Sequence, residues 1–253
     1  MGGGPEARDL ASSNQRPRPP RAVCIARSPR PCRAGSLLSI VELGSAHTIR
    51  MHREGESMPR MSAPEASCCR SAPWSLLARR MVPWATQGFP VTENVLEIGG
   101  GSGAMAEAIV QANPWVRLTT TDADPVMVEV AQQCLVRFPH AEACQADATR
   151  LPFEDESFDT VVSFLMLHHV IEWEHAVVEG SRVLRPGGAL VGYDLLASRM
   201  ASLVHRADRS PHRLIDPGAF EPVLDQVGLE LPALRLSFGG RILRFVAQKP
   251  ATR

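Results

Sequence analysis

The stretch from Asn94 to Val110 constrains the fold more than any other part of the sequence. It reads NVLEIGGGSGAMAEAIV, with a short apolar run, four glycines within five residues, and then apolar residues at helical spacing. Glycine is costly between regular elements unless the backbone must turn sharply or something must come close to it. The pattern therefore predicts a strand, a glycine-rich loop and a helix, with a ligand beside the loop.

From about Val91 onward, segments typical of strands and helices alternate. The last helix is expected to begin at Asp216 with Pro217 as its first residue, and two alternating apolar runs around Gly239 and Gly240 predict a hairpin. We expect strands at 94–99, 116–122, 141–147, 158–166 and 189–195, and helices at 104–112, 124–138, 172–184 and 216–227, the third of these being stopped by Arg-Pro-Gly-Gly. This order predicts an α/β fold with a doubly wound, seven-stranded, mostly parallel sheet and a C-terminal antiparallel hairpin.

The first part of the chain has a different composition from the rest. Residues 1–80 hold thirteen arginines and six acidic residues, whereas the whole chain is formally neutral, so the remainder is acidic by about seven charges. Residues 1–72 are predicted to be a disordered Arg/Pro-rich extension, because such a segment cannot bury enough apolar surface to offset its ordering entropy. A targeting segment and a nucleic-acid-binding tail are the alternatives. Residues 73–90 are expected to form a short lid helix, interrupted at Pro83, and a linker, and 91–250 to form the main domain.

Acidic residues stand close to the glycine loop and after it. Glu97 lies two residues before the first glycine, where a carboxylate suits a cationic ligand and opposes a pyrophosphate. Asp122 ends the second expected strand, where it can accept hydrogen bonds from two ribose hydroxyls. Gly99, Gly101 and Ala104 also fit the dinucleotide fingerprint G-x-G-x-x-A. On these residues alone, an NAD(P)-dependent oxidoreductase therefore stays open as an alternative.

Residues 94–191 resemble the class I S-adenosylmethionine-dependent methyltransferases, in the type 11 group that includes quinone-biosynthesis methyltransferases. Five motifs stand in the family's order: E-x-G-x-G-x-G from Glu97, TDADPVMVEVA around Asp122, QADATRLPFEDESFDTVVS at 145–163, LHHV at 167–170 and VLRPGG at 183–188. The resemblance implies S-adenosyl-L-methionine as the cofactor and methyl transfer to a small-molecule acceptor, with 91–250 as the methyltransferase domain.

The resemblance also implies which residues contact the methionine part of the cofactor. These are Glu97 and the loop glycines Gly99, Gly100, Gly101 and Gly103. Acidic groups at strand ends and backbone groups at a helix start suit a ligand that carries a sulfonium and an amino acid.

The rest of the implied site follows the next strands. Asp122 would hold the ribose, and Ala123 would pack on the adenine. Asp147 would accept a hydrogen bond from the adenine amine, beside the backbone of Ala148, and Ser163 would close the floor. For Asp147, a cap on the turn before Leu-Pro-Phe is the alternative interpretation.

His168 is the candidate catalytic residue, since the resemblance places it near the cofactor's amino-acid end or the acceptor. A packed or solvated histidine is the alternative, because the sequence shows neither its reach nor its pKa. The segment 195–218 is expected to help build the acceptor site. Its basic residues indicate either a solvated surface or an acceptor with negative charge: His205, Arg206, Arg209, His212 and Arg213.

The remaining features limit the partners. No Cys/His spacing predicts a metal site, and no apolar run approaches a membrane span. The acidic main domain argues against a nucleic-acid acceptor. We therefore expect a cytoplasmic enzyme without stable membrane insertion, with its oligomeric state open. A catalytically inactive protein that binds S-adenosylmethionine as a scaffold or regulator is the alternative function.

Overall fold

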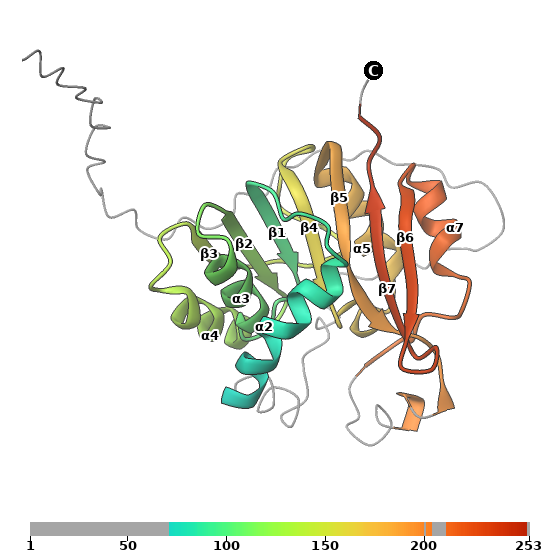
Figure 1. Ribbon diagram of the computed structural model, residues 1–253, viewed down its shortest axis with the longest axis horizontal. Coiled ribbons are helices and arrows are strands. Elements are labelled where there is room, and N and C mark those ends of the chain that lie inside the picture. The colour runs from blue at the N-terminus through green and yellow to red at the C-terminus, as the bar shows by residue number, and fades with distance from the viewer. Residues whose placement is uncertain (1–70, 200, 204–210, 252–253) are drawn as a thin grey trace, which may run out of the picture. The chain divides into compact units, whose positions relative to one another are not determined.

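The computed structural model describes residues 71–199, 201–203 and 211–251 (Figure 1). All but the last two residues of the predicted disordered extension 1–72 lie outside them, as do His205, Arg206 and Arg209. Seven strands form one sheet in the order β3-β2-β1-β4-β5-β7-β6. They are β1 Asn94–Ile98, β2 Arg117–Asp122, β3 Ala141–Gln145, β4 Phe158–Phe164, β5 Leu184–Leu195, β6 Glu230–Ser237 and β7 Ile242–Gln248.

Strands β1 to β5 pair in parallel, and β7 pairs antiparallel with both β5 and β6. The predicted fold class and terminal hairpin are therefore confirmed. The helices are α2 Ala72–Thr86, α3 Ala104–Ala112, α4 Pro125–Leu135, the 3₁₀ turn η1 Leu167–His169, α5 Trp173–Val183 and α7 Phe220–Gln226. Helices α2, α3 and α4 cover one face of the sheet, and α5 and α7 cover the other (Figure 1).

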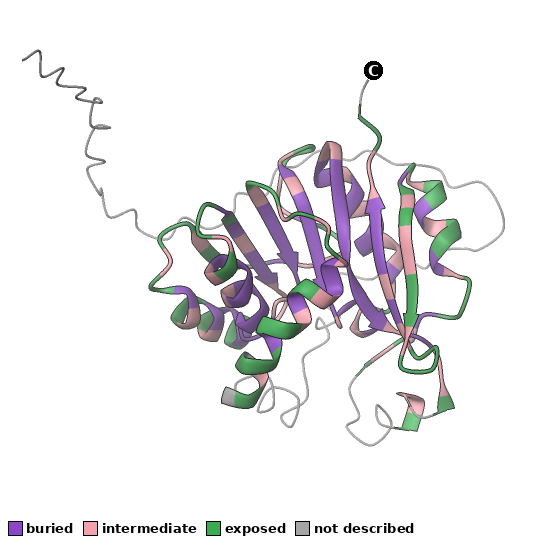
Figure 2. Ribbon diagram, in the orientation of Figure 1, coloured by how far each residue is buried: buried purple, intermediate pink, exposed green. Residues whose placement is uncertain are grey.

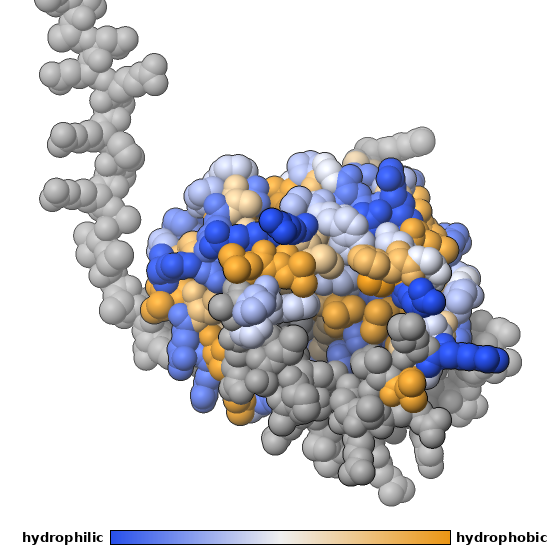
Figure 3. Space-filling model, turned by 60° about the horizontal axis from the view of Figure 1, so that its bottom comes forward, coloured by the Kyte–Doolittle hydropathy of each residue, from blue (hydrophilic) through white to orange (hydrophobic). Residues whose placement is uncertain are grey.

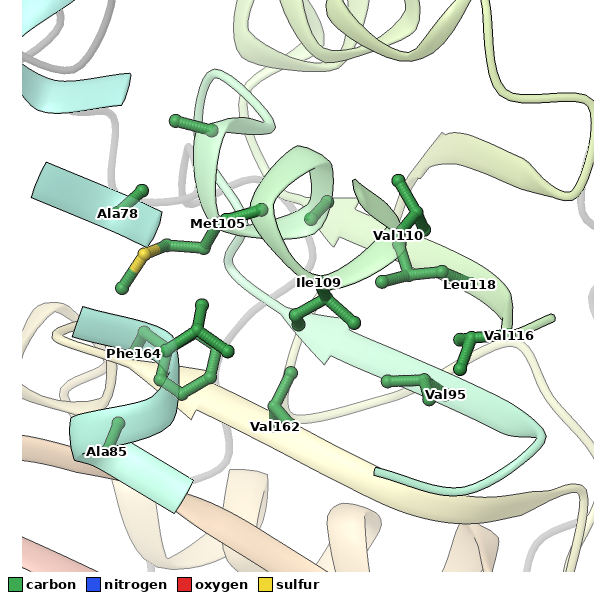
Figure 4. Packing of buried hydrophobic residues seen from close by; sticks show 14 of the residues in the cluster. Ala78, Ala85, Val95, Met105, Ile109, Val110, Val116, Leu118, Val162 and Phe164 are labelled. Atoms are coloured by element: carbon green, nitrogen blue, oxygen red, sulfur yellow. The ribbon is translucent and has the colours of Figure 1, made fainter. Parts of the chain in front are cut away.

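Burial on both faces explains the near-continuous apolar runs of the central strands (Figure 2). Adjacent residues of β4 serve opposite sides, because side chains alternate along a strand. Val162 packs with Ile109 of α3 in one hydrophobic cluster (Figure 4), and Val161 packs with Val177 of α5 in the other. The sheet thus carries two cores and holds its strand ends in fixed register.

Helix α2 occupies the segment expected to form a lid. Its N-cap is Ser71, whose hydroxyl accepts a hydrogen bond from Trp74 N. Ala78 packs beside Met105 of α3, and Ala85 packs beside Phe164 of β4 (Figure 4). The expected interruption at Pro83 is wrong, since the helix continues to Thr86. The apolar residues that pack on either side of Pro83 hold the helix in place despite the missing N–H.

Two other boundaries differ from the expectation. Helix α5 ends at Val183 and β5 begins at Leu184, so Arg-Pro-Gly-Gly lies inside the strand, where a shift in the β4–β5 register accommodates it. Helix α7 begins at Phe220, not at Asp216. Gly218 has a φ of 84°, which an α-helix cannot contain, so the residues before Phe220 form a turn.

Gly192 sets how closely β5 approaches β4. A Cβ atom at this position would overlap the carbonyl oxygen of Ser163 and lie 3.0 Å from the Phe245 ring. We expect Gly192→Ala to lower the free energy of unfolding by about 3 kcal/mol or more, because backbone cannot move aside in a sheet. Urea unfolding measures this.

The matched control is Gly180→Ala in the middle of α5. A Cβ atom there would have no neighbour nearer than 3.6 Å. Because alanine favours helix, this variant should gain about 0.5–1 kcal/mol. Equal stability of the two variants would contradict the close approach of β4 and β5.

Candidate functional site

The predicted site residues gather at the carboxyl ends of the parallel strands. Ile98 at the end of β1 pairs with Thr121 of β2 on one side and with Ser163 of β4 on the other, and Asp122 pairs with Gln145 of β3. In Figure 1 the arrowheads of these strands point to the lower edge. Figure 3 turns that side forward and shows hydrophobic patches among hydrophilic ones. Ligands of doubly wound sheets bind at this edge.

The glycine loop between β1 and α3 packs closely against other side chains of the protein. Gly99 and Gly101 have φ values of 68° and 55°, in the left-handed region that favours glycine. A Cβ at Gly99 would overlap the Met166 side chain, and one at Gly100 would overlap Thr120 Oγ1. The sequence predicted that a ligand comes close to this loop. The structure shows that the protein itself also comes close, which is a second reason for glycine here.

Glu97 lies beneath the loop and is 1% exposed. Its Oε2 accepts a hydrogen bond of 2.6 Å from Thr120 Oγ1, and its backbone oxygen accepts one of 3.0 Å from Thr121 Oγ1. Burial raises the pKa of Glu97 to about 7, against the hydrogen bond from Thr120, and the charge of Asp122 raises it further. A cation bound above the loop would stabilise the ionised form of this buried carboxyl group.

Asp122 ties the loop to the next strand. Its Oδ2 accepts a hydrogen bond of 2.9 Å from Gly101 N, and its Oδ1 accepts one of 2.9 Å from Asp124 N. Burial raises the pKa of Asp122, although these backbone hydrogen bonds lower it. Two further loop amides also donate within the protein, Gly100 N to Thr121 O and Gly103 N to Gly100 O. The loop therefore keeps few amides for a phosphate.

The expected adenine-contacting residues follow β2 and β3. Ala123 is half-buried, and its carbonyl accepts a hydrogen bond of 3.0 Å from Gln145 Nε2. Asp147 Oδ1 accepts from Thr149 N and Thr149 Oγ1, both at 2.8 Å, so this oxygen caps the turn. Asp147 Oδ2 has no partner within the described residues. The predicted contacts of Asp147 and Ala148 with an adenine stay predictions.

Ser163 is buried between Ile98 and Gly192 and is 1% exposed. Its Oγ is one of the buried side-chain atoms that lack a hydrogen-bond partner in the described part of the chain. An unpaired buried hydroxyl is costly, so a site residue with spare hydrogen-bonding capacity fits this position.

His168 lies in η1 and is paired with a carboxylate that the sequence reasoning missed. His168 Nδ1 lies 2.6 Å from Asp194 Oδ1, and both side chains are almost fully buried. Asp194 also accepts hydrogen bonds from Met166 N, Leu167 N and Leu195 N, at 3.0, 2.7 and 2.6 Å. The signal available in the sequence was an acidic residue inside the apolar run ALVGYDLL.

The Asp194 carboxylate holds a strained turn in place. Leu165, directly after β4, has a φ of 56°, which is uncommon for a residue with a side chain. The next residue, Met166, fills the space left by the missing side chain of Gly99. His168 O in turn accepts a hydrogen bond of 2.8 Å from Arg213 N, in the segment expected to build the acceptor site. Asp194 therefore connects that segment to the glycine loop.

None of the helices in the described part of the chain is long and apolar enough to cross a bilayer. Within the same residues, no group of three or more His, Cys, Asp or Glu is arranged to hold a metal ion.

Part of the chain is similar to known methyltransferases. A family model described as a methyltransferase domain matches residues 96–192, from β1 to the middle of β5. A demethylmenaquinone methyltransferase of Clavibacter sepedonicus is 35% identical over 99 residues, which are 39% of this chain and 40% of that protein. A ubiquinone/menaquinone biosynthesis C-methyltransferase of Cupriavidus necator is 32% identical over 114 residues, 44% and 47% of the two chains. The chain thus spans less than half the length of these curated relatives.

Solved structures resemble the fold at low identity. The phosphoethanolamine N-methyltransferase 2 of Haemonchus contortus, solved with S-adenosylhomocysteine, gives a TM-score of 0.57 at 15% identity, covering 69% of this chain and 52% of that one. The [4+2]-cyclase SpnF gives 0.61 at 17% identity, covering 72% and 84%. A cyclase among the neighbours shows that the fold by itself does not fix the reaction.

The sheet order and the acidic, glycine-lined edge define a Rossmann-like methyltransferase fold. Within that class, residues 96–192 match the methyltransferase-domain model of the type 11 family, and the similar curated proteins named above are methyltransferases. The resemblance stated from the sequence motifs is thereby confirmed, and the dinucleotide fingerprint was a partial match.

The raised pKa of Glu97 predicts a pH-dependent stability. The pKa is about 7 in the folded protein against an ordinary value of 4.5, so the folded state holds this proton more tightly. The contribution of Glu97 to stability is therefore full below pH 4.5 and is lost as the pH rises through about 7. Glu97→Gln should gain stability relative to wild type over that window, on the order of 3 kcal/mol.

Urea unfolding at several pH values tests this. Asp122 titrates in both proteins, so its contribution largely cancels in the comparison. The exposed Glu129→Gln in α4 is the control and should follow the wild-type profile. A constant difference between Glu97→Gln and wild type across the window would show that Glu97 is not destabilised by burial.

The Asp194 pair predicts the tautomer of His168. An ionised carboxylate only accepts hydrogen bonds, so Nδ1 carries the hydrogen and Nε2 carries the lone pair of the neutral ring. In Asp194→Asn, the amide can donate to Nδ1, which favours the opposite tautomer. Nitrogen-15 NMR of the histidine rings, assigned with His168→Gln, reads this directly. Asp159→Asn, which contacts Arg185 and Asn94, is the control. A wild-type ring protonated at Nε2 alone would refute the assignment.

Proposed function

We propose that this protein transfers the methyl group of S-adenosyl-L-methionine to a small-molecule acceptor. The observation that carries the proposal is a pair of carboxylates, the buried Glu97 and the half-buried Asp122, below and beside a loop in which the amides of Gly100, Gly101 and Gly103 already donate within the protein. A pyrophosphate needs free amides and no negative charge at that place, whereas a sulfonium and an ammonium group are attracted to it.

The residues present fit the cofactor's parts. The loop and Glu97 would hold the methionine part, Asp122 the ribose, and Ser163 the floor beside the buried end of β4. Ala123, Asp147 and Ala148 would border the adenine. When bound, the cofactor supplies an electrophilic methyl group. The chain supplies alignment with the acceptor, which accounts for much of the rate of an in-line displacement.

His168 is proposed to act at the acceptor end. With Asp194 accepting from Nδ1, the ring presents Nε2 as the nitrogen that can accept a proton from the acceptor's nucleophilic atom. Asp194 is then a positioning residue, which sets the tautomer and holds η1. Helix α2 is proposed to serve as a lid, since it lies across α3 and the carboxyl half of β4 (Figure 1).

The acceptor is proposed to be a small molecule of the kinds that the relatives' names print, which are quinone precursors and a phthiotriol lipid. We also propose a cytoplasmic location, because Cys134 is a thiol and burial beside Glu107 raises its pKa to about 12, as befits an unreactive cysteine.

The test combines cofactor binding with methyl transfer. Wild type should bind S-adenosylmethionine, and Asp122→Ala should weaken it by about 10- to 100-fold, because charge-assisted hydrogen bonds are lost. Asp225→Ala, exposed on α7, is the matched control and should bind normally. Labelled methyl transfer to quinone precursors, phenols and a metabolite extract then tests catalysis. Tight binding without any transfer would support the inactive scaffold, and absence of binding would refute the proposal.

A further inference from the structure

Two arginines face each other beside the proposed site. Arg244 of β7 lies between Arg235 of β6 and Tyr193 of β5 in the sheet register. The Arg244 guanidinium lies over the Trp84 ring of α2, 4.4 Å from its centroid, and its Nη1 donates a hydrogen bond of 2.9 Å to Trp84 O. The pair therefore lies on the face of the sheet that carries α2.

This positive charge has no counter-charge among the described residues. Neither Arg235 nor Arg244 pairs with a described carboxylate, and Arg244 Nε is buried without a hydrogen-bond partner there. Four other described arginines have carboxylate partners, namely Arg137, Arg182, Arg185 and Arg213, and what distinguishes Arg235 and Arg244 is that two unpaired arginines stand directly opposite each other. Like charges directly opposite in an antiparallel pair destabilise a sheet. Burial lowers the pKa of Arg244, and the charge of Arg235 lowers it further, because both disfavour the protonated guanidinium.

Aromatic rings lie beside Arg244 and continue along the sheet toward the proposed cofactor site. Trp84 makes edge contacts with Tyr193 at 5.3 Å and with Phe238 at 6.0 Å, and Phe238 is 67% exposed at the hairpin tip. Tyr193 O accepts a hydrogen bond of 2.8 Å from Leu165 N, in the strained turn after β4. The hairpin tip itself lies at the carboxyl end of β5, since Leu195 pairs with Ile242. Strand β5 thus separates Arg244 from β4, which carries Ser163 at the floor of the proposed cofactor site, and Arg235 lies one strand further out.

We propose that Arg235 and Arg244 bind an anionic group, a carboxylate or a phosphate, of the methyl acceptor, with the rings of Trp84 and Phe238 beside its apolar body. The inference rests on the proposed function, because it places the acceptor beside the cofactor site. Planar guanidinium groups bind such anions with paired hydrogen bonds, and an anion here would relieve the repulsion between the two arginines.

Calorimetry on the full chain with S-adenosylhomocysteine present tests the proposal. The probes are 4-hydroxybenzoate and phenyl phosphate, which separate the two anions, and 4-hydroxybenzamide, which keeps the shape of the benzoate without its charge. At least one anion should bind about 10-fold or more tightly than the amide. Equal affinity of the three, or no saturable binding of either anion, would overturn the proposal.

Substitutions of the two arginines test whether the anion binds to them. Arg235→Gln should weaken binding of the anion by about 10-fold or more, and Arg244→Gln should do the same. Arg235 is exposed, so its variant keeps the test valid if loss of the bond to Trp84 O impairs folding of the other. Arg117→Gln, exposed at the amino end of β2, is the matched control. Unchanged affinity in Arg235→Gln would overturn the proposal. S-adenosylmethionine binding, measured on the same proteins, tests the proposed function separately.

Discussion

The hydrogen bond from Gly101 N to Asp122 is the interaction on which the rest of the site depends. It fixes the glycine loop against the end of β2 and takes an amide that a phosphate would otherwise use. Because the loop is held down, Glu97 is sealed beneath it and keeps its proton to higher pH than an exposed carboxyl would. One backbone contact thus determines both the shape of the edge and the sign of charge that it favours.

A second carboxylate, that of Asp194, fixes a loop on the other side of β1 in a similar way. Asp194 accepts hydrogen bonds from three backbone amides and pairs with the His168 ring, and it thereby holds the turn that follows β4. That turn places Met166 against Gly99, so the two loops support each other. The cost of burying Asp194 is offset by the number of donors around it. Rigid support of this kind is what an alignment-dependent reaction requires of its protein.

The sequence predicted what local pattern and motif determine. Apolar runs and glycines located the strands, the loop and the terminal hairpin, and the motif residues at β1, β2 and β4 meet at one edge as expected. Contacts between distant segments were not predictable. Asp194 meets His168 across 26 residues, and Arg244 reaches Trp84 across 160 residues. Pro83 was wrongly predicted to stop α2, because local propensity gave no sign of the packing that sustains the helix.

We propose that this edge of the sheet selects a cationic cofactor over a dinucleotide. Calorimetry of the full chain with S-adenosylmethionine and with NADH, above the pKa of Glu97, measures that choice most directly. We expect saturable binding of one S-adenosylmethionine per chain and an affinity for NADH weaker by about 100-fold or more, since the carboxylates of the buried Glu97 and the half-buried Asp122 oppose the pyrophosphate. Equal affinity for the two, or tighter binding of NADH, would contradict it.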